Sequence, residues 1–457
     1  MFHKKHAYDF DLIVIGSGAG GSVGAHYARS LGKSVAIFEA DAIGGECPNF
    51  ACIPTKTLLH TAMMYENIKE SKEYGINVSG LSINFHAVRK WKETVVSRTG
   101  AAHGVESFHR DGIQVIRERA RFISPHEVDA GGKIYSAAKF LLATGSKVFI
   151  PPITGLNDVG YITFKEAIEL TEPPKTLLIF GGGVVGCEFA QIFATFGTKV
   201  TLVNRSEKLL GKEEDEVSDL IQALFENAGI TVLTNTSVIK TEKQGNKKVV
   251  HLQKGDKEYF ETFDEILIAT GKVPSLDFAP EKAGIVLEKG RLHVNRYLQT
   301  NVPHIYAAGD VIGPYLFTHT GYYQSDIAAH NAFSYDKIVP DYRVVPRCVF
   351  VIPEIASVGI TEQEAREKKM KIKIGITPIA VLGRANTSNE FDGFVKIITD
   401  NKGVIIGGSI VAPRAGEMIH EVALAMKCRV TAFELARMIH AYPTYSEAIK
   451  IACSLVE

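Results

Sequence analysis

The stretch DLIVIGSGAGG, residues 11–21, runs from an apolar segment straight into a glycine-rich turn. The apolar segment predicts a buried parallel strand, because strands that are covered on both faces are apolar along nearly their whole length. Gly16, Gly18 and Gly21 follow with the spacing G-x-G-x-x-G. Glycines at this spacing let the backbone approach a pyrophosphate, which the N–H groups at the start of the next helix can bind.

The residues after this turn complete the pattern. We expect a helix over residues 22–31 and a second strand over 34–38, which ends at Glu39. Glu39 lies eighteen residues after Gly21, close to the position at which a carboxylate accepts hydrogen bonds from ribose hydroxyls. Glycines alone could form a turn in another kind of α/β unit, but strand, glycines, helix and acid together predict a dinucleotide-binding unit.

A second copy of the pattern begins near residue 176. An expected strand over 176–180 leads into GGGVVG, in which Gly181, Gly183 and Gly186 have the same spacing. A helix and a strand over 199–203 are expected to follow, and an Ala-Thr-Gly segment ends a strand in each copy. We therefore predict two nucleotide-binding domains, one inserted within the other.

The two copies differ after their second strand. Where the first has its acid, the second has Asn204 and Arg205. An arginine can pair with the 2′-phosphate of NADPH, which a carboxylate would repel. The second copy is therefore predicted to prefer NADPH, with NADH as the second choice. The alternative is that Arg205 is an ordinary solvated side chain.

The first copy is followed by GGECPNFACIPTK, residues 44–56, which contains Cys47 and Cys52. A disulfide requires Cα atoms about 4.4–6.8 Å apart, whereas five residues of a regular helix rise about 7.5 Å and end on another face. A bridge between these cysteines is thus incompatible with one undistorted helix. We expect Pro48 to keep Cys47 out of the helical region, and Pro54 to lie in the first turn of a helix.

That helix would place Cys52 near its positive end and close to Lys56, and both features stabilise a thiolate. The spacing leaves two interpretations open, a pair of buried inert thiols or a redox pair. A metal site is disfavoured, because no second cysteine pair and no paired histidines accompany these residues in the sequence.

Composition narrows the function classes. The chain has 457 residues, of which 46% are hydrophobic, so several domains with substantial cores are expected. Its 51 basic and 51 acidic residues balance, which gives no support for a nucleic-acid or membrane-surface partner. Six cysteines are too few for a secreted disulfide scaffold, and the sequence has no signal core or long apolar run. We expect a soluble cytoplasmic protein, in which a cysteine pair is more often catalytic.

Taken together, the chain resembles the pyridine nucleotide–disulfide oxidoreductases, the family of dihydrolipoamide dehydrogenase, glutathione reductase and mercuric reductase. The resemblance rests on both glycine fingerprints, the segment with the two cysteines and the Ala-Thr-Gly segments, and it covers nearly the whole chain. Three further segments carry it: AAGD at 307–310, PEIASVG at 353–359 and PTYSE at 443–447.

The resemblance implies an α/β fold with two Rossmann-like dinucleotide-binding domains, one inserted in the other, and a C-terminal α+β dimerisation domain. The FAD-binding domain would comprise residues 1–150 and 273–342, the NAD(P)-binding domain 151–272, and the dimerisation domain 343–457. That last domain would form a homodimer in which each subunit completes the active site of its partner.

The resemblance also implies FAD and NAD(P)H as cofactors. The backbone of Ala120 would meet the adenine, and Asp310 would hydrogen-bond the ribityl chain. The expected FAD-binding residues are Gly16, Gly18, Gly21, Glu39, Gly45, Lys56, Ala120, Thr144, Gly145 and Asp310, and the expected NAD(P)H-binding residues are Gly181, Gly183, Gly186, Asn204, Arg205 and Gly271.

The same resemblance implies an electron path. Cys52 would face the flavin as the charge-transfer thiol, and Cys47 would be the interchange thiol that attacks substrate. Lys56 would lie near the reactive flavin nitrogen and pair with Glu188. Electrons would pass from NADPH through FAD to the Cys47–Cys52 disulfide, and from the dithiol to a small-molecule or protein disulfide or another thiol-reactive acceptor.

One position departs from this pattern. Lipoamide and glutathione enzymes of the family have a histidine before the Pro-Thr of the C-terminal motif, whereas this chain has Tyr442 and retains the later Glu447. Tyrosine, with an ordinary pKa of about 10, is a poor base at neutral pH, although it can donate a proton. His440 could substitute for the missing histidine or simply pack. Mercuric reductases are similar in having a tyrosine here, but they carry a C-terminal cysteine pair, where this chain has Cys453 alone.

We therefore expect an FAD-dependent NAD(P)H oxidoreductase that acts efficiently on neither lipoamide nor glutathione. The enzymatic alternatives are dihydrolipoamide dehydrogenase proper and a mercuric-type metal reductase. An alternative from another class is a flavin-bound redox sensor with little turnover. The acceptor pocket would be assembled across the dimer from residues that no motif identifies.

Overall fold

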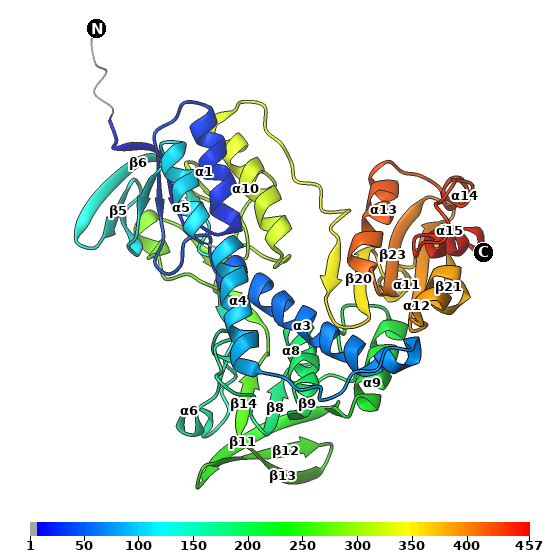
Figure 1. Ribbon diagram of the computed structural model, residues 1–457. Coiled ribbons are helices and arrows are strands. Elements are labelled where there is room, and N and C mark those ends of the chain that lie inside the picture. The colour runs from blue at the N-terminus through cyan, green and yellow to red at the C-terminus, as the bar shows by residue number, and fades with distance from the viewer. Residues whose placement is uncertain (1–6, 100) are drawn as a thin grey trace. The chain divides into compact units, whose positions relative to one another are not determined.

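The computed structural model of the chain describes residues 7–99 and 101–457, which form two compact units (Figure 1). The first unit combines the chain up to Thr57 with Arg89–Phe149 and Gly271–Asp341. The second unit combines Leu58–Val88, Ile150–Thr270 and Tyr342–Glu457. Each unit is thus assembled from segments that lie far apart in the sequence.

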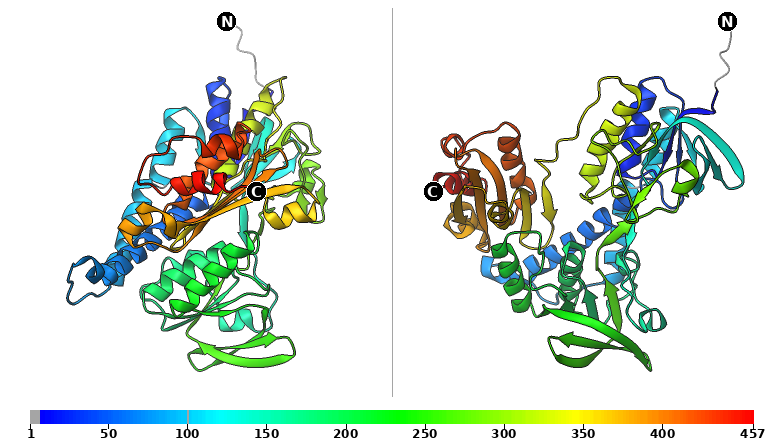
Figure 2. Two further views of the ribbon diagram at one scale, coloured as in Figure 1. Left: turned by 90° about the vertical axis from the view of Figure 1, so that its right-hand side faces the viewer. Right: turned by 180° about the vertical axis from the view of Figure 1, so that it is seen from behind.

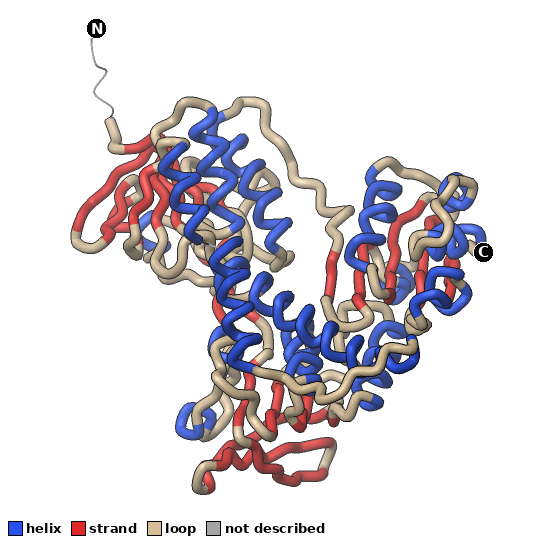
Figure 3. The backbone as a smooth tube through the Cα atoms, viewed as in Figure 1, coloured by secondary structure: helices blue, strands red, loops and turns tan. Residues whose placement is uncertain are grey.

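The centre of the first unit is a seven-stranded sheet, whose strands are red in Figure 3. Its parallel strands follow the order β3-β2-β1-β6, and β18 pairs with the last residues of β6. β5 and β4 continue from the first residues of β6 as an antiparallel meander. The strands are β1 (Phe10–Ile15), β2 (Val35–Phe38), β3 (Gln114–Ile116), β4 (Ala120–Ser124), β5 (Glu127–Ala130), β6 (Lys133–Leu142) and β18 (Ile305–Ala307).

Helices α1 (Ala19–Ser30) and α10 (Thr318–Phe333) lie side by side over one face of this sheet (Figure 1). Leu12 and Val14 of the central strand pack in the core beneath these helices. Ile13, which lies between them in the sequence, packs in a separate aromatic-rich core on the opposite face. The strand is therefore buried on both faces, which is the physical reason for its unbroken apolar sequence.

The remaining elements of this part of the chain are short or lead away from the cysteine segment. Strands β7 and β15 form a two-stranded antiparallel ribbon, as do β16 and β17. These strands are β7 (Ser146–Val148), β15 (Lys272–Pro274), β16 (Leu287–Glu288) and β17 (Arg291–Leu292). The helices are α2 (Glu46–Asn49), α3 (Cys52–Glu70), α4 (Phe85–Thr99) and α5 (Ala101–Arg110). Two 3₁₀ turns lie at Ser71–Tyr74 and Pro280–Ala283.

The second unit contains a four-stranded parallel sheet in the order β10-β9-β8-β14 and a three-stranded antiparallel sheet, β11-β12-β13. The predicted strands 176–180 and 199–203 are confirmed as β8 and β9. The elements are α6 (Leu156–Val159), α7 (Phe164–Ala167), β8 (Thr176–Phe180), α8 (Val184–Thr195), β9 (Lys199–Val203), α9 (Asp215–Asn227), β10 (Thr231–Leu233), β11 (Thr236–Gln244), β12 (Lys247–Lys254), β13 (Lys257–Phe263) and β14 (Glu265–Ile268).

The same unit ends in a five-stranded antiparallel sheet, β19-β20-β23-β22-β21, which is drawn in yellow to orange in Figure 2. Helices of the C-terminal segment cover it and share one apolar core with it. The strands are β19 (Arg347–Val349), β20 (Glu354–Gly359), β21 (Ile372–Pro378), β22 (Phe394–Asp400) and β23 (Ile405–Ala412), the helices are α11 (Glu362–Glu367), α12 (Gly383–Ser388), α13 (Ala415–Lys427), α14 (Ala432–Ala436) and α15 (Glu447–Ser454), and Ile379–Val381 is a 3₁₀ turn.

Both glycine fingerprints therefore lie between a buried parallel strand and a helix, as predicted. The predicted α/β fold, with two Rossmann-like units and a C-terminal α+β part, is confirmed. The predicted domain limits at 150, 272 and 342 stay a prediction, because the second unit joins the part expected to bind NAD(P) to the C-terminal part.

Candidate active site

The first fingerprint forms a turn that has no room for side chains. A Cβ on Gly16, whose φ is 104°, would lie 2.2 Å from the carbonyl oxygen of Ala143, and a Cβ on Gly21 would lie 2.0 Å from that of Gly16. Helix α1 begins directly after Gly18, which has no side chain with which to cap it. The loop therefore offers backbone N–H groups at a positive helix end, which suits a pyrophosphate.

Glu39, the predicted ribose acid, is held by the fingerprint loop itself. Its Oε2 accepts hydrogen bonds from the N and Oγ of Ser17 at 2.9 and 2.7 Å, and its Oε1 accepts one from the N of Asp41 at 2.9 Å. Ser17 Oγ also accepts from the N of Gly44, at 2.9 Å. One serine, which the motif leaves undefined, thus connects the fingerprint to the acid and to the cysteine segment.

Close backbone contacts gather other predicted FAD-binding residues around this loop. A Cβ on Gly45 would lie 2.7 Å from Gly18 Cα, so the start of the cysteine segment packs directly on the fingerprint. A Cβ on Gly20 would lie 2.6 Å from the carbonyl oxygen of Ala308, just before Asp310. Asp310 accepts a hydrogen bond from Ser146 Oγ at 2.6 Å. These contacts bring together the carboxyl ends of β1, β6 and β18, where ligands of parallel sheets bind.

Three predicted cofactor residues have other local roles. Thr144 Oγ1 donates to the carbonyl oxygen of Ser275 at 2.7 Å, and Gly145 takes up a positive φ of 70° beside it. Ala120 is the first residue of β4, where it is buried and pairs with Ala130. Whether these residues bind FAD stays a prediction.

The two cysteines lie in successive helical segments. Cys47 belongs to the one-turn helix α2, so the expectation that Pro48 keeps it out of the helical region is wrong. Pro48 is the third residue of α2, where a proline's missing N–H would have no acceptor within the helix. The chain instead leaves the helix at Phe50, with φ of −132°, and Cys52 then begins α3, as predicted. This break removes the obstacle that one continuous helix would pose to a disulfide.

The thiols of Cys47 and Cys52 interact. A hydrogen bond to the Cys52 thiol, followed by burial and by negative charge on Cys52, raises the pKa of Cys47 far above its ordinary value. Thr318 Oγ1 lies 3.6 Å from Cys52 Sγ, at the start of α10. Thr318 and Lys56 act in the opposite direction on the pKa of Cys47, but more weakly. Cys47 is therefore the thiol of the pair that holds its proton more strongly than an isolated cysteine would.

Sequence patterns do not single out Thr318 or Tyr322, which also faces the cysteines. Tyr322 lies one helical turn after Thr318 on α10, and its side chain is 46% exposed. Burial, and then the charges of Cys47 and Cys52, raise the pKa of this tyrosine. These residues could have been found by predicting a helix shortly after Asp310. The first turn of such a helix would lie at the end of the sheet.

The disulfide segment has a further anchor in Glu46, which directly precedes Cys47. Its carboxylate forms an ion pair with Lys272, the residue after Gly271. Gly271 has a φ of 105°, and its carbonyl oxygen accepts a hydrogen bond from the N of Phe149 at 2.9 Å. The structure thus places Gly271, predicted to bind NAD(P)H, next to a residue that contacts the cysteine segment.

Lys56 and Glu188, the predicted partners, lie on α3 and α8. Glu188 is 2% exposed, and its Oε1 accepts a hydrogen bond from the N of Phe350 at 3.0 Å. The pairing of Glu188 with Lys56 stays a prediction.

The second fingerprint repeats the construction of the first. A Cβ on Gly181 would lie 2.3 Å from the carbonyl oxygen of Ala269, and one on Gly186 would lie 1.8 Å from that of Gly181. Asn204 Oδ1 accepts a hydrogen bond from the N of Gly182 at 3.2 Å. α8 begins after Gly183, again without a side-chain cap.

The loop after Asn204 presents a cation to solvent. The Asn204 amide donates to the carbonyl oxygens of Ser206 and Lys208 at 3.1 and 2.8 Å, which fixes the turn that carries Arg205. Arg205 is exposed, whereas Lys208 pairs with Asp215 at 3.1 Å. The structure therefore places Asn204 and Arg205 beside the turn of the second fingerprint.

The C-terminal motif places its tyrosine on the surface and its histidine inside. Tyr442 is 78% exposed, with its hydroxyl beside Gly383, and Glu447 accepts from the N of Thr444 at 3.1 Å. The His440 side chain is only 4% exposed, and its Nε2 lies 2.8 Å from Glu421 Oε1. This geometry favours the alternative that His440 packs rather than replaces the missing histidine.

Exposed apolar side chains surround Tyr442 in the sequence. Leu424, Phe433 and Ile439 are 65%, 68% and 94% exposed. Among the described residues, no helix combines the length and the apolar character needed to cross a membrane.

Comparisons with known proteins agree with this geometry. Residues 10–332 match the family "Pyridine nucleotide-disulphide oxidoreductase", and residues 345–453 match the dimerisation domain of the same family. The chain is 33% identical to mercuric reductase from Bacillus cereus, over 97% of this chain and 71% of that protein. It is 32% identical to dihydrolipoyl dehydrogenase from Bacillus subtilis, over 97% of both.

A solved structure with a similar fold is the HOCl-induced flavoprotein disulfide reductase RclA from Escherichia coli. It superposes with a TM-score of 0.88 and 30% identity, covering 98% of this chain and 100% of that one. A Cu(II) complex of RclA has also been solved. The dimerisation domain supports a homodimer. Sequence, fold and site together establish that the chain belongs to the pyridine nucleotide–disulfide oxidoreductases, which are FAD-dependent enzymes that use NAD(P)H.

Proposed function

We propose that this protein is a cytoplasmic reductase that takes electrons from NADPH and delivers them, through Cys47, to a thiol-reactive acceptor. The observation that carries this proposal is the pair of interacting thiols of Cys47 and Cys52 on two successive helical segments. Two thiols that hydrogen-bond each other are placed to close into a disulfide and to be released from it by thiol–disulfide exchange. The alternative of two inert buried thiols accounts for neither this coupling nor the partial exposure of both cysteines.

The residues around the first fingerprint fit FAD. Gly16 and Gly21 permit the tight turn that leads into the start of α1, whose backbone N–H groups suit a pyrophosphate, and Glu39 is held where ribose hydroxyls would lie. Bound FAD would supply two-electron transfer between the nicotinamide and the cysteine pair. Cys52, at the positive end of α3 and beside Thr318, would carry the thiolate on the flavin side.

The acceptor step is then a thiol–disulfide exchange. Cys47 attacks one sulfur of the acceptor disulfide, forms a mixed disulfide and releases the other sulfur as a thiolate. Cys52 next attacks the sulfur of Cys47, which restores the Cys47–Cys52 disulfide and releases the second thiolate. Each leaving thiolate takes up a proton. One is the proton that Cys47 gives up when it attacks, and for the other Tyr322 and, from the partner subunit, the equivalent of Tyr442 are candidate donors.

The choice of NADPH rests on the second fingerprint. Asn204 stands where the first fingerprint has Glu39, and the exposed Arg205 follows it. A neutral amide and a guanidinium can accept a 2′-phosphate, whereas a carboxylate would repel it. NADH is the second choice.

Reduction of a soft metal ion is a second candidate activity. It is favoured by Tyr442, which stands where the lipoamide enzymes have histidine, and by the likeness to mercuric reductase and to RclA, which has been solved with Cu(II). Delivery of a metal by C-terminal cysteines is disfavoured here. Cys453 is buried, and burial, with a smaller contribution from Glu421, raises the pKa of its thiol to about 12.

Anaerobic titration of the FAD-loaded protein with NADPH tests the core of the proposal. A long-wavelength thiolate-to-flavin absorption band is expected in the native protein and in Cys47→Ser, and it should disappear in Cys52→Ser. No band in the native protein would contradict the redox-pair assignment.

Steady-state NADPH consumption then separates the candidate acceptors. Disulfides, Hg²⁺ in excess thiol and Cu²⁺ are tested with native protein and Cys47→Ser, because a true acceptor requires Cys47. Efficient oxidation of dihydrolipoamide with NAD⁺ would identify dihydrolipoamide dehydrogenase instead. Cysteines that cycle with oxidants, while NADPH consumption stays at background for every acceptor, would identify a redox sensor.

A further inference from the structure

The loop expected to bind the 2′-phosphate of NADPH has the wrong charge for that task. Residues 204–216, which comprise the loop after β9 and the first two residues of α9, contain three basic and five acidic side chains. Four of the acids are consecutive, Glu213, Glu214, Asp215 and Glu216. Because like charges repel, these carboxylates would weaken the binding of a phosphate at Arg205 unless other groups neutralise them.

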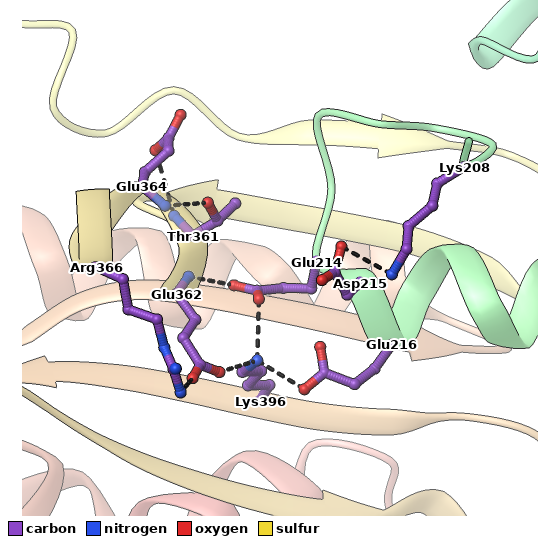
Figure 4. A network of polar contacts seen from close by, with 9 residues as sticks. All are labelled: Lys208, Glu214, Asp215, Glu216, Thr361, Glu362, Glu364, Arg366 and Lys396. Carbon is purple, nitrogen blue, oxygen red and sulfur yellow. Dashed lines mark hydrogen bonds and ion pairs between the residues drawn. The ribbon is translucent and has the colours of Figure 1, made fainter. Parts of the chain in front are cut away.

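A buried lysine of the C-terminal sheet binds two of these acids (Figure 4). Lys396, on β22, is 1% exposed. Its Nζ lies 2.9 Å from Glu214 Oε2, 2.8 Å from Glu216 Oε1 and 2.7 Å from Glu362 Oε2. Three carboxylates thus accept the three N–H bonds of one ammonium group. The other oxygen of Glu214 accepts from the N of Glu362 at 2.9 Å, which leaves this carboxylate fully engaged.

The two remaining acids of the run also have cationic partners. Arg347, on β19, lies 3.2 and 3.4 Å from the two carboxylate oxygens of Glu213, which also accepts from Ser357 Oγ. Asp215 pairs with Lys208 at 3.1 Å, as Figure 4 shows. Two of the three cations that bind the acidic run therefore come from the C-terminal sheet and not from the nucleotide-binding part.

The other end of the loop is fixed to the second fingerprint. Asn204 accepts from the N of Gly182, and the carbonyl oxygen of Gly182 accepts from the N of Leu210 at 2.8 Å. Ser218 Oγ donates to the carbonyl oxygen of Leu209 at 2.6 Å inside the protein. The loop thus spans the distance between the fingerprint and the C-terminal sheet, with Arg205 exposed near its fingerprint end.

We propose that Lys396, assisted by Arg347, is a positioning residue that sets coenzyme selectivity: it offsets part of the negative charge of the acidic run 213–216 and holds that run on the C-terminal sheet, so that Arg205 can bind a 2′-phosphate. This inference rests on the proposed preference for NADPH. Lys396 acts through Glu214 and Glu216, and not by touching the coenzyme.

The charge on Lys396 persists at neutral pH. Burial lowers its pKa, but the hydrogen bonds that Lys396 donates to Glu216, Glu362 and Glu214 outweigh burial, so the pKa of Lys396 is raised above its ordinary value. The hydrogen bond from Lys396 in turn lowers the pKa of Glu362. Lys396 and Glu362 therefore stay ionised at the pH at which the enzyme would bind its coenzyme.

The test uses FAD-loaded protein and needs no acceptor. The rate constant for anaerobic flavin reduction is measured by stopped flow with NADPH and with NADH, and their ratio is compared between variants. Lys396→Met should lower the NADPH:NADH ratio by roughly threefold to tenfold, the size expected for loss of one charge near the phosphate. Lys396→Arg should restore most of the ratio. Glu216→Gln, which removes an acid, should raise it.

A matched control is Lys248→Met, because Lys248 forms a partly buried ion pair with Glu265 in the same unit. It should leave the ratio unchanged. If Lys396→Met slows flavin reduction by NADPH and by NADH equally, the ratio is unchanged. That result would overturn the inference and leave the preference for NADPH standing. A native protein that prefers NADH would refute that preference, while the change of ratio in Lys396→Met would still decide the role of Lys396. If Lys396→Met does not fold, an unchanged ratio in Glu216→Gln overturns the inference.

Discussion

The two glycine fingerprints hold their loops with different groups in the same place. In the first, Ser17 donates to the carboxylate of Glu39, and in the second, Gly182 donates to the amide oxygen of Asn204. Both pairs span the same interval of 22 residues. The loops therefore share their backbone construction and differ in charge. The comparison teaches that the shape of such a loop and its selectivity for a phosphate are separable properties.

Replacing one glycine by alanine in each fingerprint turn, in separate variants, should have the largest effect on FAD binding and on flavin reduction. A Cβ on Gly21 or on Gly186 would lie 2.0 or 1.8 Å from a carbonyl oxygen of its own turn. We expect Gly21→Ala to lose nearly all bound FAD, and Gly186→Ala to keep FAD while NADPH reduces it at least about a hundredfold more slowly. Flavin absorbance and stopped-flow reduction measure these effects. Equal loss of FAD from both variants would show that the loops do not act separately.

Giving the second fingerprint loop a carboxylate, as the first has, should have the next largest effect on flavin reduction by NADPH. Asn204→Asp keeps an acceptor for the N of Gly182 but places a carboxylate beside the expected phosphate and near the carbonyl oxygens of Ser206 and Lys208. The rate of flavin reduction by NADPH should fall by roughly tenfold to a hundredfold, and that by NADH much less. Glu39→Gln is the control in the first loop, and a change of the NADPH:NADH ratio there would contradict the comparison.

Removing the cation of the second loop should have a smaller effect. Arg205→Met loses a charge-assisted hydrogen bond to the 2′-phosphate, so reduction by NADPH should slow by about tenfold. Reduction by NADH should be nearly unchanged, and Arg205→Lys should recover part of the loss. If all three proteins show the same selectivity, Arg205 is an ordinary solvated residue.

The smallest effect is expected from Ser17, which has no counterpart side chain in the second loop. Ser17→Ala removes the hydroxyl that links Glu39 to the N of Gly44. This should weaken FAD binding or the folded state by about 1 kcal/mol, because one hydroxyl loses its two partners and the N–H of Ser17 still binds Glu39. Titration of the FAD-free protein with FAD measures the change. Unaltered FAD affinity and thermal stability would mean that the linkage has no energetic role.

Much of the fold could be predicted from local sequence. Strands over 176–180 and 199–203 end where the apolar runs end, because parallel strands covered on both faces require such runs. Pro48 shows the limit of this reasoning. The prediction considered only the steric effect of a proline on the preceding residue, whereas the start of α2 at Glu46 puts Pro48 in a first turn that tolerates it.

The candidate site was predictable only where a motif repeats a fixed geometry. Gly16, Glu39 and Cys52 lie within short segments whose spacing encodes a turn or a helix start. Thr318 and Tyr322 lie more than 250 residues after the cysteines, and they meet them only because α10 packs beside α1 on one sheet. Contacts of this kind depend on how strands from distant segments pair, which no local pattern encodes.

The sequence by itself determined the two fingerprints, the cysteine pair with its helix, and the replacement of an acid by Asn204 and of a histidine by Tyr442. These features depend on the identity and spacing of neighbouring residues, so they can be recognised in the sequence without knowledge of the fold. Tertiary structure decided what surrounds them: His440 lies within hydrogen-bonding distance of Glu421, the Cys52 thiol raises the pKa of Cys47, and Lys396 from a distant strand binds Glu214 and Glu216. The reason is that electrostatic interactions depend on distance and burial, and these are set by packing between segments that the sequence order does not place together.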